Sequence, residues 1–220
     1  MNTKQVVAVI GASGKMGSAI AKSLAKGNYR ILLHSSKTNK VRFLLDEIKS
    51  SNSSADIEIV DEYMEVCWEA DIIVLAIPNT VEKEVAENIR KVANQKVVVS
   101  ISNPFNNMYT GLITAPGTSA AEELQKMLPH TKVIKAFNTT FAGDFYQPVV
   151  NGQQVDCFIA GNNEDALQVV YGLVKTAGFN PVIVGDLSVS RTLESMQLLL
   201  IQLSMQNNYK WIAGWKILHN

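Results

Sequence analysis

The chain runs from Val6-Val7-Ala8-Val9-Ile10 directly into Gly11-Ala12-Ser13-Gly14-Lys15-Met16-Gly17, and a helical pattern follows. An unbroken apolar run of this length is typical of a strand that is buried on both faces of a parallel sheet. Three glycines spaced G-x-x-G-x-x-G between a strand and a helix are typical of a loop that holds a dinucleotide pyrophosphate. There Gly11 allows the tight turn, Gly14 lets the backbone approach the phosphates, and Gly17 lets the helix pack closely. A glycine turn without a ligand is the alternative.

Apolar runs and helical patterns alternate along the rest of the chain. We expect strands at residues 6–10, 30–33, 57–60, 72–77, 96–100, 132–137, 157–160 and 182–184, and helices at 14–25, 80–92, 119–128, 164–176 and 188–207. This alternation predicts an α/β fold with a Rossmann-type, doubly wound, mostly parallel sheet. A Pro/Gly/Gln-rich stretch at residues 147–154 predicts a boundary. We therefore expect a nucleotide-binding domain over residues 1–148 and a small C-terminal α/β lobe over residues 149–220, packed on the first.

Composition excludes several classes of protein. The 220 residues include 47% hydrophobic and 18% charged residues, with 20 basic and 20 acidic side chains. A net charge of zero gives no reason to expect nucleic acid or an anionic membrane as a partner. Two cysteines and three histidines are scattered without metal-ligand spacing, so no metal site is expected. The apolar runs are too short for a signal-peptide core or a bilayer span, which predicts a cytoplasmic protein.

The end of the second expected strand bears on the choice of dinucleotide. NAD-specific domains usually carry an acidic residue there for the ribose 2′-hydroxyl, but this chain has His34-Ser35-Ser36-Lys37. Two hydroxyls and an ammonium group suit a 2′-phosphate. We therefore predict a preference for NADP. The alternative is that these residues only cap the helix that begins near Thr38.

Three further strand ends are expected at the same edge of the sheet. Ala76-Ile77-Pro78 follows the fourth strand and can form an apolar shelf beside the nicotinamide, or simply end the strand. Asn103 and Asn138 follow the fifth and sixth strands, and their amides can hold a carboxamide or a polar ring edge. Each asparagine is equally well explained as a turn residue.

The sequence shows no evident acid–base pair, so the catalytic residues stay unassigned. Lys135 is a candidate proton donor, but it lies within an expected strand and is discounted. A carbonyl reductase needs such a donor, whereas hydride exchange between two rings depends mainly on their positioning. The residues therefore favour hydride exchange with a flavin-like ring. The alternatives are an NADPH-dependent reductase of a small imine or carbonyl compound and a non-catalytic NADP-binding module.

With these residues in view, the chain resembles the NADPH-dependent deazaflavin (coenzyme) reductase family, the NADP oxidoreductases, to which the nucleotide-binding domain of membrane ferric reductases is related. The segments that carry the resemblance are 11–17, 34–37, 76–78, 97–100, 118–122, 133–139 and 185–195. The resemblance implies NADP over the glycine loop and a flavin or deazaflavin co-substrate stacked on the nicotinamide. The family pattern after the second strand is typically Gly-Ser-Arg, whereas here it is His34-Ser35-Ser36, so the phosphate contacts rest on Ser36 and Lys37.

Together these arguments predict one set of cofactor-binding residues: Gly11, Ala12, Ser13, Gly14, Lys15, Met16, Gly17, His34, Ser35, Ser36, Lys37, Ala76, Ile77, Pro78, Asn103 and Asn138. The long helix at residues 188–207 carries an apolar stripe, and Trp211 and Trp215 follow it. This region is expected either to pack in the core or to form a dimer interface, and the resemblance implies a homodimer. On the helix surface, Arg191 and Glu194 are spaced to form an ion pair.

Overall fold

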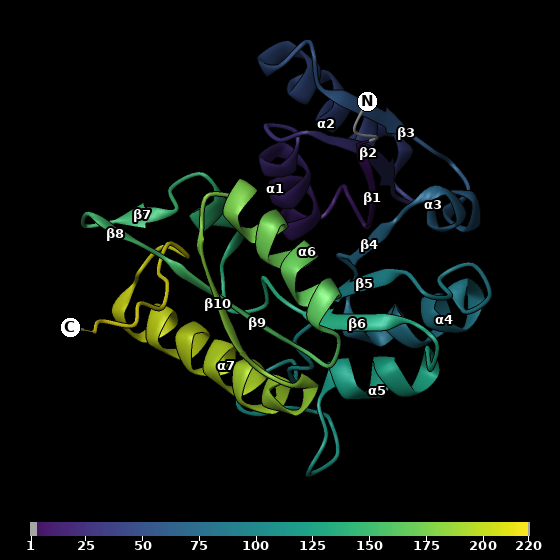
Figure 1. Cartoon of the computed structure of the whole chain (residues 1–220). Coiled ribbons are helices and arrows are strands. Elements are labelled where there is room, and N and C mark those ends of the chain that lie inside the picture. The colour runs from purple at the N-terminus through teal and green to yellow at the C-terminus, as the bar shows by residue number, and fades with distance from the viewer. Residues whose placement is uncertain (1–3, 220) are drawn as a thin grey trace.

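The computed structural model describes residues 4–219, which form one eight-stranded sheet flanked by helices (Figure 1). The strand order is β10-β9-β6-β5-β4-β1-β2-β3. The strands are β1 (Gln5–Ile10), β2 (Tyr29–His34), β3 (Asp56–Ile59), β4 (Ile72–Leu75), β5 (Val97–Ser100), β6 (Lys132–Lys135), β9 (Asp156–Gly161) and β10 (Asn180–Gly185). The chain order reverses between β1 and β4, which makes that position the switch point where such sheets bind ligands.

The helices cover both faces of the sheet. They are α1 (Lys15–Leu24), α2 (Thr38–Ser51), α3 (Tyr63–Glu69), α4 (Asn79–Ile89), α5 (Ala120–Met127), α6 (Glu164–Thr176) and α7 (Ser190–Asn207). Apolar side chains of α1, α2 and α6 form one core with the sheet, and those of α3, α4 and α5 form a second core on the opposite face. The inner strands β4, β5, β6 and β9 are almost wholly buried, as their continuous apolar runs predict, whereas the edge strands β3 and β10 are mostly half-buried or exposed.

The predicted α/β fold is confirmed, and three of its features could not be seen in the sequence. β9 runs antiparallel to β6, and β10 runs parallel to β9. A short hairpin forms from β7 (Val149–Val150) and β8 (Gln153–Gln154), and the short helix α3 was not expected. β9 and β10 extend the eight-stranded sheet, so among the strands within residues 149–219 only the hairpin of β7 and β8 lies outside it. The domain boundary at residue 148 stays a prediction.

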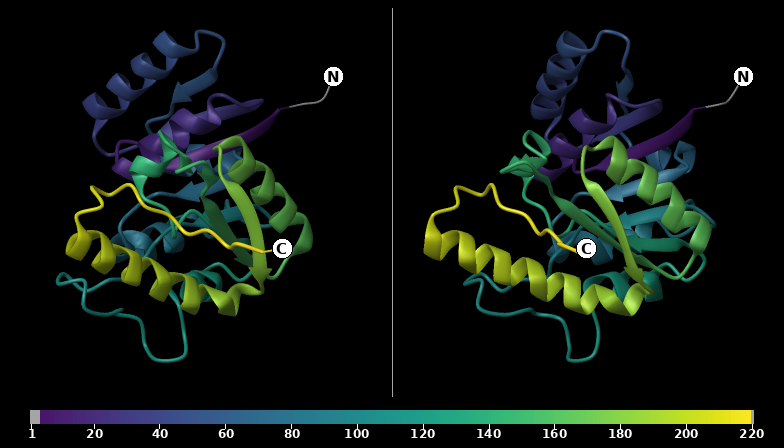
Figure 2. Two further views of the ribbon diagram at one scale, coloured as in Figure 1. Left: turned by 90° about the vertical axis from the view of Figure 1, so that its left-hand side faces the viewer. Right: turned by 60° about the vertical axis from the view of Figure 1, so that its left-hand side comes forward.

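The long helix α7 lies beside β10 and the loop between β5 and α5 (Figure 2). Leu193 of α7 packs against Phe158 and Ala160 of β9. Gln202 Nε2 donates to the carbonyl oxygen of Tyr109 in that loop at 2.8 Å. The chain then turns back across the molecule, and the backbone N–H groups of Ala213 and Ile217 donate to the buried carboxylates of Asp144 and Asp156. No helix within residues 4–219 is long and apolar enough to cross a membrane.

Candidate nucleotide-binding site

The glycine loop is held between the ends of two strands. The carbonyl oxygen of His34, at the end of β2, accepts the N–H groups of Gly11 and Ala12 at 2.9 and 3.0 Å. Gly11 has φ +85°, and a Cβ there would lie 2.3 Å from the carbonyl oxygen of Ala76, just after β4. Glycine is therefore required at residue 11 by both the backbone conformation and the available space.

The first turn of α1 is shaped to receive an anion. A Cβ at Gly17 would lie 2.4 Å from the carbonyl oxygen of Gly11, so only glycine lets the helix start this close to the loop. Gly14 is the N-cap residue and is exposed, and no described side chain caps α1. The N–H groups of the first turn thus remain available to phosphate oxygens, which the helix dipole also favours. Lys15 is exposed at the same turn, Met16 is half-buried against the core, and Ala12 is buried beneath the loop.

A pair of serines joins the glycine loop to the end of β2. The Oγ atoms of Ser13 and Ser35 lie 2.5 Å apart, and Ser35 Oγ also accepts the N–H of Lys37 at 3.1 Å. Ser35 therefore links the glycine loop to the segment after β2, while the side chains of Ser36 and Lys37 are exposed. The imidazole of His34 turns away from the loop, with Nδ1 3.2 Å from the carbonyl oxygen of Val60. Ser36 and Lys37 are thus exposed after β2, and their contact with a 2′-phosphate stays a prediction.

The end of β4 forms the other wall of the loop. The N–H of Ala76 donates to the carbonyl oxygen of Ile10 at 2.8 Å, and Ile77 Cγ2 would lie 3.0 Å from a Cβ on Gly11. Pro78 is exposed and is the N-cap residue of α4. The structure therefore brings Ala76 and Ile77 against the glycine loop, and Pro78 follows them at the start of α4. Their role as a shelf for the nicotinamide stays a prediction.

Asn103 and Asn138 lie together but use their donors on each other and on α7. Asn103 Nδ2 donates to the carbonyl oxygen of Asn138 at 2.9 Å, and Asn138 Nδ2 donates to Asn103 Oδ1 at 3.0 Å and to the carbonyl oxygen of Leu193 at 3.1 Å. Asn138 follows Phe137, which is fully buried with φ +59°, a strained conformation for a side chain of this size. The pair fixes the junction of β5, β6 and α7 at the carboxyl edge of the sheet.

Sequence reasoning missed a buried ionisable cluster beneath this edge. Lys135 and Glu194 are fully buried, with Lys135 Nζ 2.7 Å from Glu194 Oε1 and 2.5 Å from the carbonyl oxygen of Ser102. The expected surface pair of Arg191 with Glu194 is wrong, because Arg191 instead binds both carboxylate oxygens of Glu122, at 2.9 and 2.5 Å. Residues i and i+3 can pair only on one helix face, and here α7 turns Glu194 toward the sheet.

Glu82 on the first turn of α4 is the third member of the cluster. Its side chain is 2% exposed, and Oε2 accepts from Asn79 Nδ2 at 3.1 Å. Burial raises the pKa of the Glu82 carboxyl to about 7, against the lowering effect of Lys135. The sequence signal that could have found this residue is weak, because acidic residues are common on the first turn of any helix.

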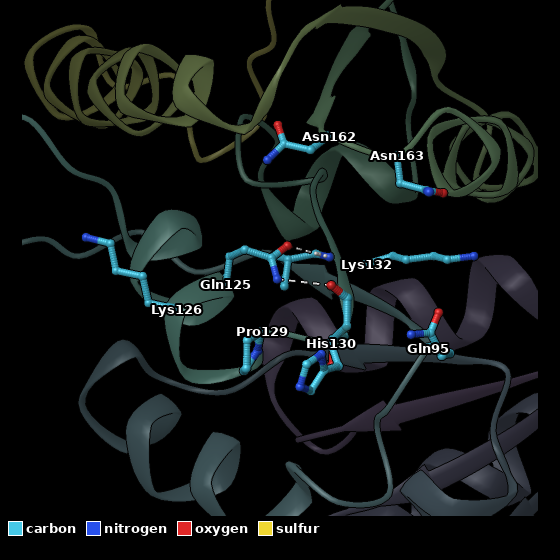
Figure 3. Close-up of a pocket in the computed structure, with 10 residues that line it drawn as sticks. Gln95, Gln125, Lys126, Pro129, His130, Lys132, Asn162 and Asn163 are labelled. Atoms are coloured by element: carbon cyan, nitrogen blue, oxygen red, sulfur yellow. Dashed lines mark hydrogen bonds between the residues drawn. The ribbon is translucent and has the colours of Figure 1, made fainter.

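A large cavity lies away from these residues. Its volume is about 550 Å³, and its walls include Gln95, Gln125, Lys132 and Asn162 (Figure 3). Lys132 is the first residue of β6, which places the cavity at the amino end of that strand. Ligands of such sheets bind at the carboxyl ends, so the glycine loop remains the candidate site. Within residues 4–219 no group of His, Cys, Asp or Glu side chains is arranged to hold a metal ion.

Comparison with known proteins agrees with this geometry. Residues 6–104 match the family model described as NADP oxidoreductase, coenzyme F420-dependent. The chain is 28% identical to the F420-dependent NADP reductase of Methanocaldococcus jannaschii, over 93% of this chain and 94% of that one. It is 26% identical to the F420-dependent NADP reductase of Methanothermobacter thermautotrophicus, over 93% of this chain and 91% of that one. F420 is a deazaflavin, so the resemblance to the deazaflavin reductases is confirmed, while the relation to membrane ferric reductases stays a prediction.

The same fold is seen in a solved structure. A protein of Arthrobacter sp. FB24, provisionally described as an F420-dependent NADP reductase, superposes with a TM-score of 0.83 at 20% identity, covering 99% of this chain and 100% of that one. At this identity the superposition establishes the fold alone. It places all of the elements described above, including β9, β10 and α7, within one known architecture.

Proposed function

We propose that this chain, a homologue of the F420-dependent NADP reductases, is an NADP-dependent oxidoreductase that transfers hydride between NADP(H) and a deazaflavin coenzyme. The observation that carries the proposal is the similarity to two such reductases over more than nine-tenths of each chain. Similarity of this extent includes the C-terminal segment with β9, β10 and α7 as well as the glycine loop. The proposal therefore covers the coenzyme as well as the nucleotide.

The proposed nucleotide site consists of the glycine loop and the strand ends around it. The N–H groups at the start of α1 bind the pyrophosphate, and Ser36 and Lys37 bind the 2′-phosphate. The support for this placement is the space reserved by Gly11 and Gly17 and the exposure of Gly14, Ser36 and Lys37. NADP supplies the hydride chemistry when bound. The protein fixes the position of the nicotinamide and keeps one face open to the second ring.

The state of Lys135 argues against a small imine or carbonyl substrate. Such a reductase needs a proton donor at the reacting atom, and Lys135 was the candidate lysine. Its ammonium group is fully buried and is held by Glu194 and the carbonyl oxygen of Ser102. The ammonium group is therefore held inside the fold and cannot reach a substrate from there. We propose that catalysis depends on positioning two rings.

The experiment that tests the proposal follows NADPH oxidation by absorbance with F420, FMN, FAD and no acceptor in parallel. Turnover with F420 well above that with FMN and FAD is the expected result. Turnover with an imine or a ketoacid but not with F420 would support the small-substrate reductase instead. Tight NADPH binding without oxidation by any of these compounds would identify a binding module.

We also propose a homodimer located in the cytoplasm. The support for the dimer is a set of exposed apolar side chains at the end of α7 and in the segment after it: Leu199, Met205, Trp211 and Ile212. The support for the location is that Cys67 and Cys157 are both free thiols, as expected in a reducing compartment. Light scattering at micromolar concentration tests the assembly, and a monomeric mass would contradict the dimer.

A further inference from the structure

The buried cluster of Glu82, Lys135 and Glu194 lies near the carboxyl edge of the sheet, and Glu82 closely follows residues 76–78, which are proposed to face the nicotinamide. Three elements converge there. Lys135 is the last residue of β6, Glu194 lies on α7, and Glu82 lies on the first turn of α4, four residues after Pro78. Ser100 pairs with Lys135 across β5 and β6, so their side chains leave the same face of the sheet. Ser102 and Asn103 follow β5 at the carboxyl edge of the sheet.

The charges in this cluster do not balance. Lys135 is neutralised by Glu194 at 2.7 Å, which leaves Glu82 without a cation of its own. One of its oxygens accepts from Asn79, and the other, Oε1, is buried without a hydrogen-bond partner among the described residues. An ionised carboxylate in this position is costly to bury. A nearby positive charge would therefore be strongly favoured when Glu82 is ionised.

The proposed cofactor brings such a charge in only one of its two redox states. The nicotinamide ring carries a positive charge in NADP⁺ and none in NADPH. We propose that the carboxyl of Glu82 is the proton-linked group of the nucleotide site, so that its ionised form favours the oxidised nucleotide and its protonated form favours the reduced one. The inference rests on the proposed nucleotide site and adds a link between pH and the redox state of the bound nucleotide.

The groups around Glu82 identify it as the member of the cluster that changes charge. Burial raises the pKa of Glu82 to about 7. Lys135 of β6, Asn79 and the Ser102 side chain lower this pKa, and Glu194 of α7 raises it. Glu122 of the neighbouring α5 is turned outward to Arg191, and Glu84 of α4 itself is exposed. Glu82 thus gains and loses its proton near neutral pH.

The test is a pH series of separate dissociation constants for NADP⁺ and NADPH, measured by calorimetry on the full chain. The quantity of interest is the ratio of the NADPH constant to the NADP⁺ constant. Contributions from the 2′-phosphate cancel in this ratio, because both nucleotides carry it. We expect the ratio to rise about threefold to tenfold from pH 5.5 to pH 8.5, the size of effect that one charge exerts across a packing layer.

Two variants locate the effect. In Glu82→Gln the amide oxygen can still accept from Asn79, and we expect a ratio fixed at the low-pH value of the unmodified protein. The matched control is Glu84→Gln, which removes the same charge from the exposed side of the same helix and should leave the pH dependence intact. Asp144, whose pKa burial also raises to about 7, is unchanged in both variants, so it cannot account for a difference between them.

A second measurement does not depend on a variant. Calorimetry in two buffers of different ionisation enthalpy counts the protons exchanged on binding, and at pH 7 NADP⁺ should release more protons than NADPH. A flat ratio with equal proton release would overturn the inference while leaving the proposed function in place. The same pH dependence in Glu82→Gln as in the unmodified protein would also overturn it. Binding of neither nucleotide at any pH would contradict the proposed function itself, and the inference with it.

Discussion

The Nζ atom of Lys135 and the Oε1 atom of Glu194 lie 2.7 Å apart, and both side chains are fully buried. Each group has one further partner, since Lys135 donates to the carbonyl oxygen of Ser102 and Glu194 Oε2 accepts from the N–H of Ala120. The pair therefore ties β6 and α7 to the loop after β5 and to the start of α5. These contacts lie directly beneath the edge where the strand ends form the candidate site.

Replacing Lys135 by methionine should destabilise the fold by about 3–5 kcal/mol, because Glu194 would be left as an unpaired buried charge. The double variant K135M/E194Q should recover much of this loss, since its amide oxygen can still accept from the N–H of Ala120 and neither of the two substituted side chains is charged. Urea denaturation measures both free energies of unfolding. The matched control is Lys83→Met, which breaks the exposed pair with Glu87 and should change stability by less than about 1 kcal/mol. Equal losses for Lys135→Met and Lys83→Met would contradict the account.

Gly17→Ala should disrupt the glycine loop, because the new Cβ would lie 2.4 Å from the carbonyl oxygen of Gly11. We expect lower thermal stability and at least a tenfold loss of NADPH affinity. Gly172→Ala in α6 is the matched control, since its Cβ would lie at an ordinary 3.7 Å from the Tyr29 hydroxyl. That variant should gain about 0.5–1 kcal/mol from the higher helix propensity of alanine. NADPH affinity unchanged in Gly17→Ala would show that the loop does not hold the nucleotide.

Ser36→Ala and Lys37→Ala should each weaken NADPH binding by about tenfold, the effect of losing one charge-assisted hydrogen bond of about 1.4 kcal/mol. NADH has no 2′-phosphate, so its affinity should stay the same. Lys26→Ala removes an exposed lysine just after the C-terminal end of α1, at the opposite end of the helix from the glycine loop, and is the control. Fluorescence titration with both nucleotides measures the change. An equal loss of affinity for NADPH and for NADH would mean that Ser36 and Lys37 do not bind the 2′-phosphate.

Glu82→Gln should also change how stability depends on pH. The folded pKa of Glu82 is about 7 and the ordinary value is 4.5, so the folded protein binds the proton more tightly than the unfolded chain does. The contribution of this group to stability is therefore full below its ordinary pKa, is lost as pH rises, and stays lost above pH 7. Relative to the unmodified protein, Glu82→Gln should gain on the order of 2 kcal/mol between pH 5 and pH 8. Denaturation curves at both pH values check this, with Glu84→Gln expected to show no such gain.

Much of the fold could be predicted from the sequence because its strands are buried on both faces. Continuous apolar runs such as Ile72–Leu75 and Val97–Ser100 mark such strands directly, and Glu164–Thr176 has well-marked helix ends. The direction of β9 could not be predicted, since a buried strand has the same composition whether its neighbour is parallel or antiparallel. The hairpin of β7 and β8 has only two residues in each strand, too few for a periodic signal.

The candidate site, like the fold, could be predicted only in part from the sequence. Gly11, Gly14 and Gly17 are readable because their spacing reflects one local turn, and Ser36 and Lys37 follow from their place after β2. The cluster of Glu82, Lys135 and Glu194 comes from three elements that are far apart in the chain, so no local sequence pattern indicates it. Asn103 and Asn138 were found as strand-end residues, but their mutual hydrogen bonds depend on the packing of α7 against the sheet.

The most direct test of the central claim is transfer of a label from NADPH to the deazaflavin. NADPH carrying deuterium on one face of the nicotinamide C4 is mixed with the protein and F420, and the reduced coenzyme is analysed by mass spectrometry. Because the acceptor position of a deazaflavin is a ring carbon, a transferred deuterium is retained there. The account predicts that NADPH labelled on one of the two faces passes its deuterium to F420 in a one-to-one ratio. The measurement is made separately with NADPH labelled on each face of C4. The proposed hydride transfer is contradicted if F420 oxidises neither of the two labelled samples, or if the reduced F420 carries hydrogen from solvent only.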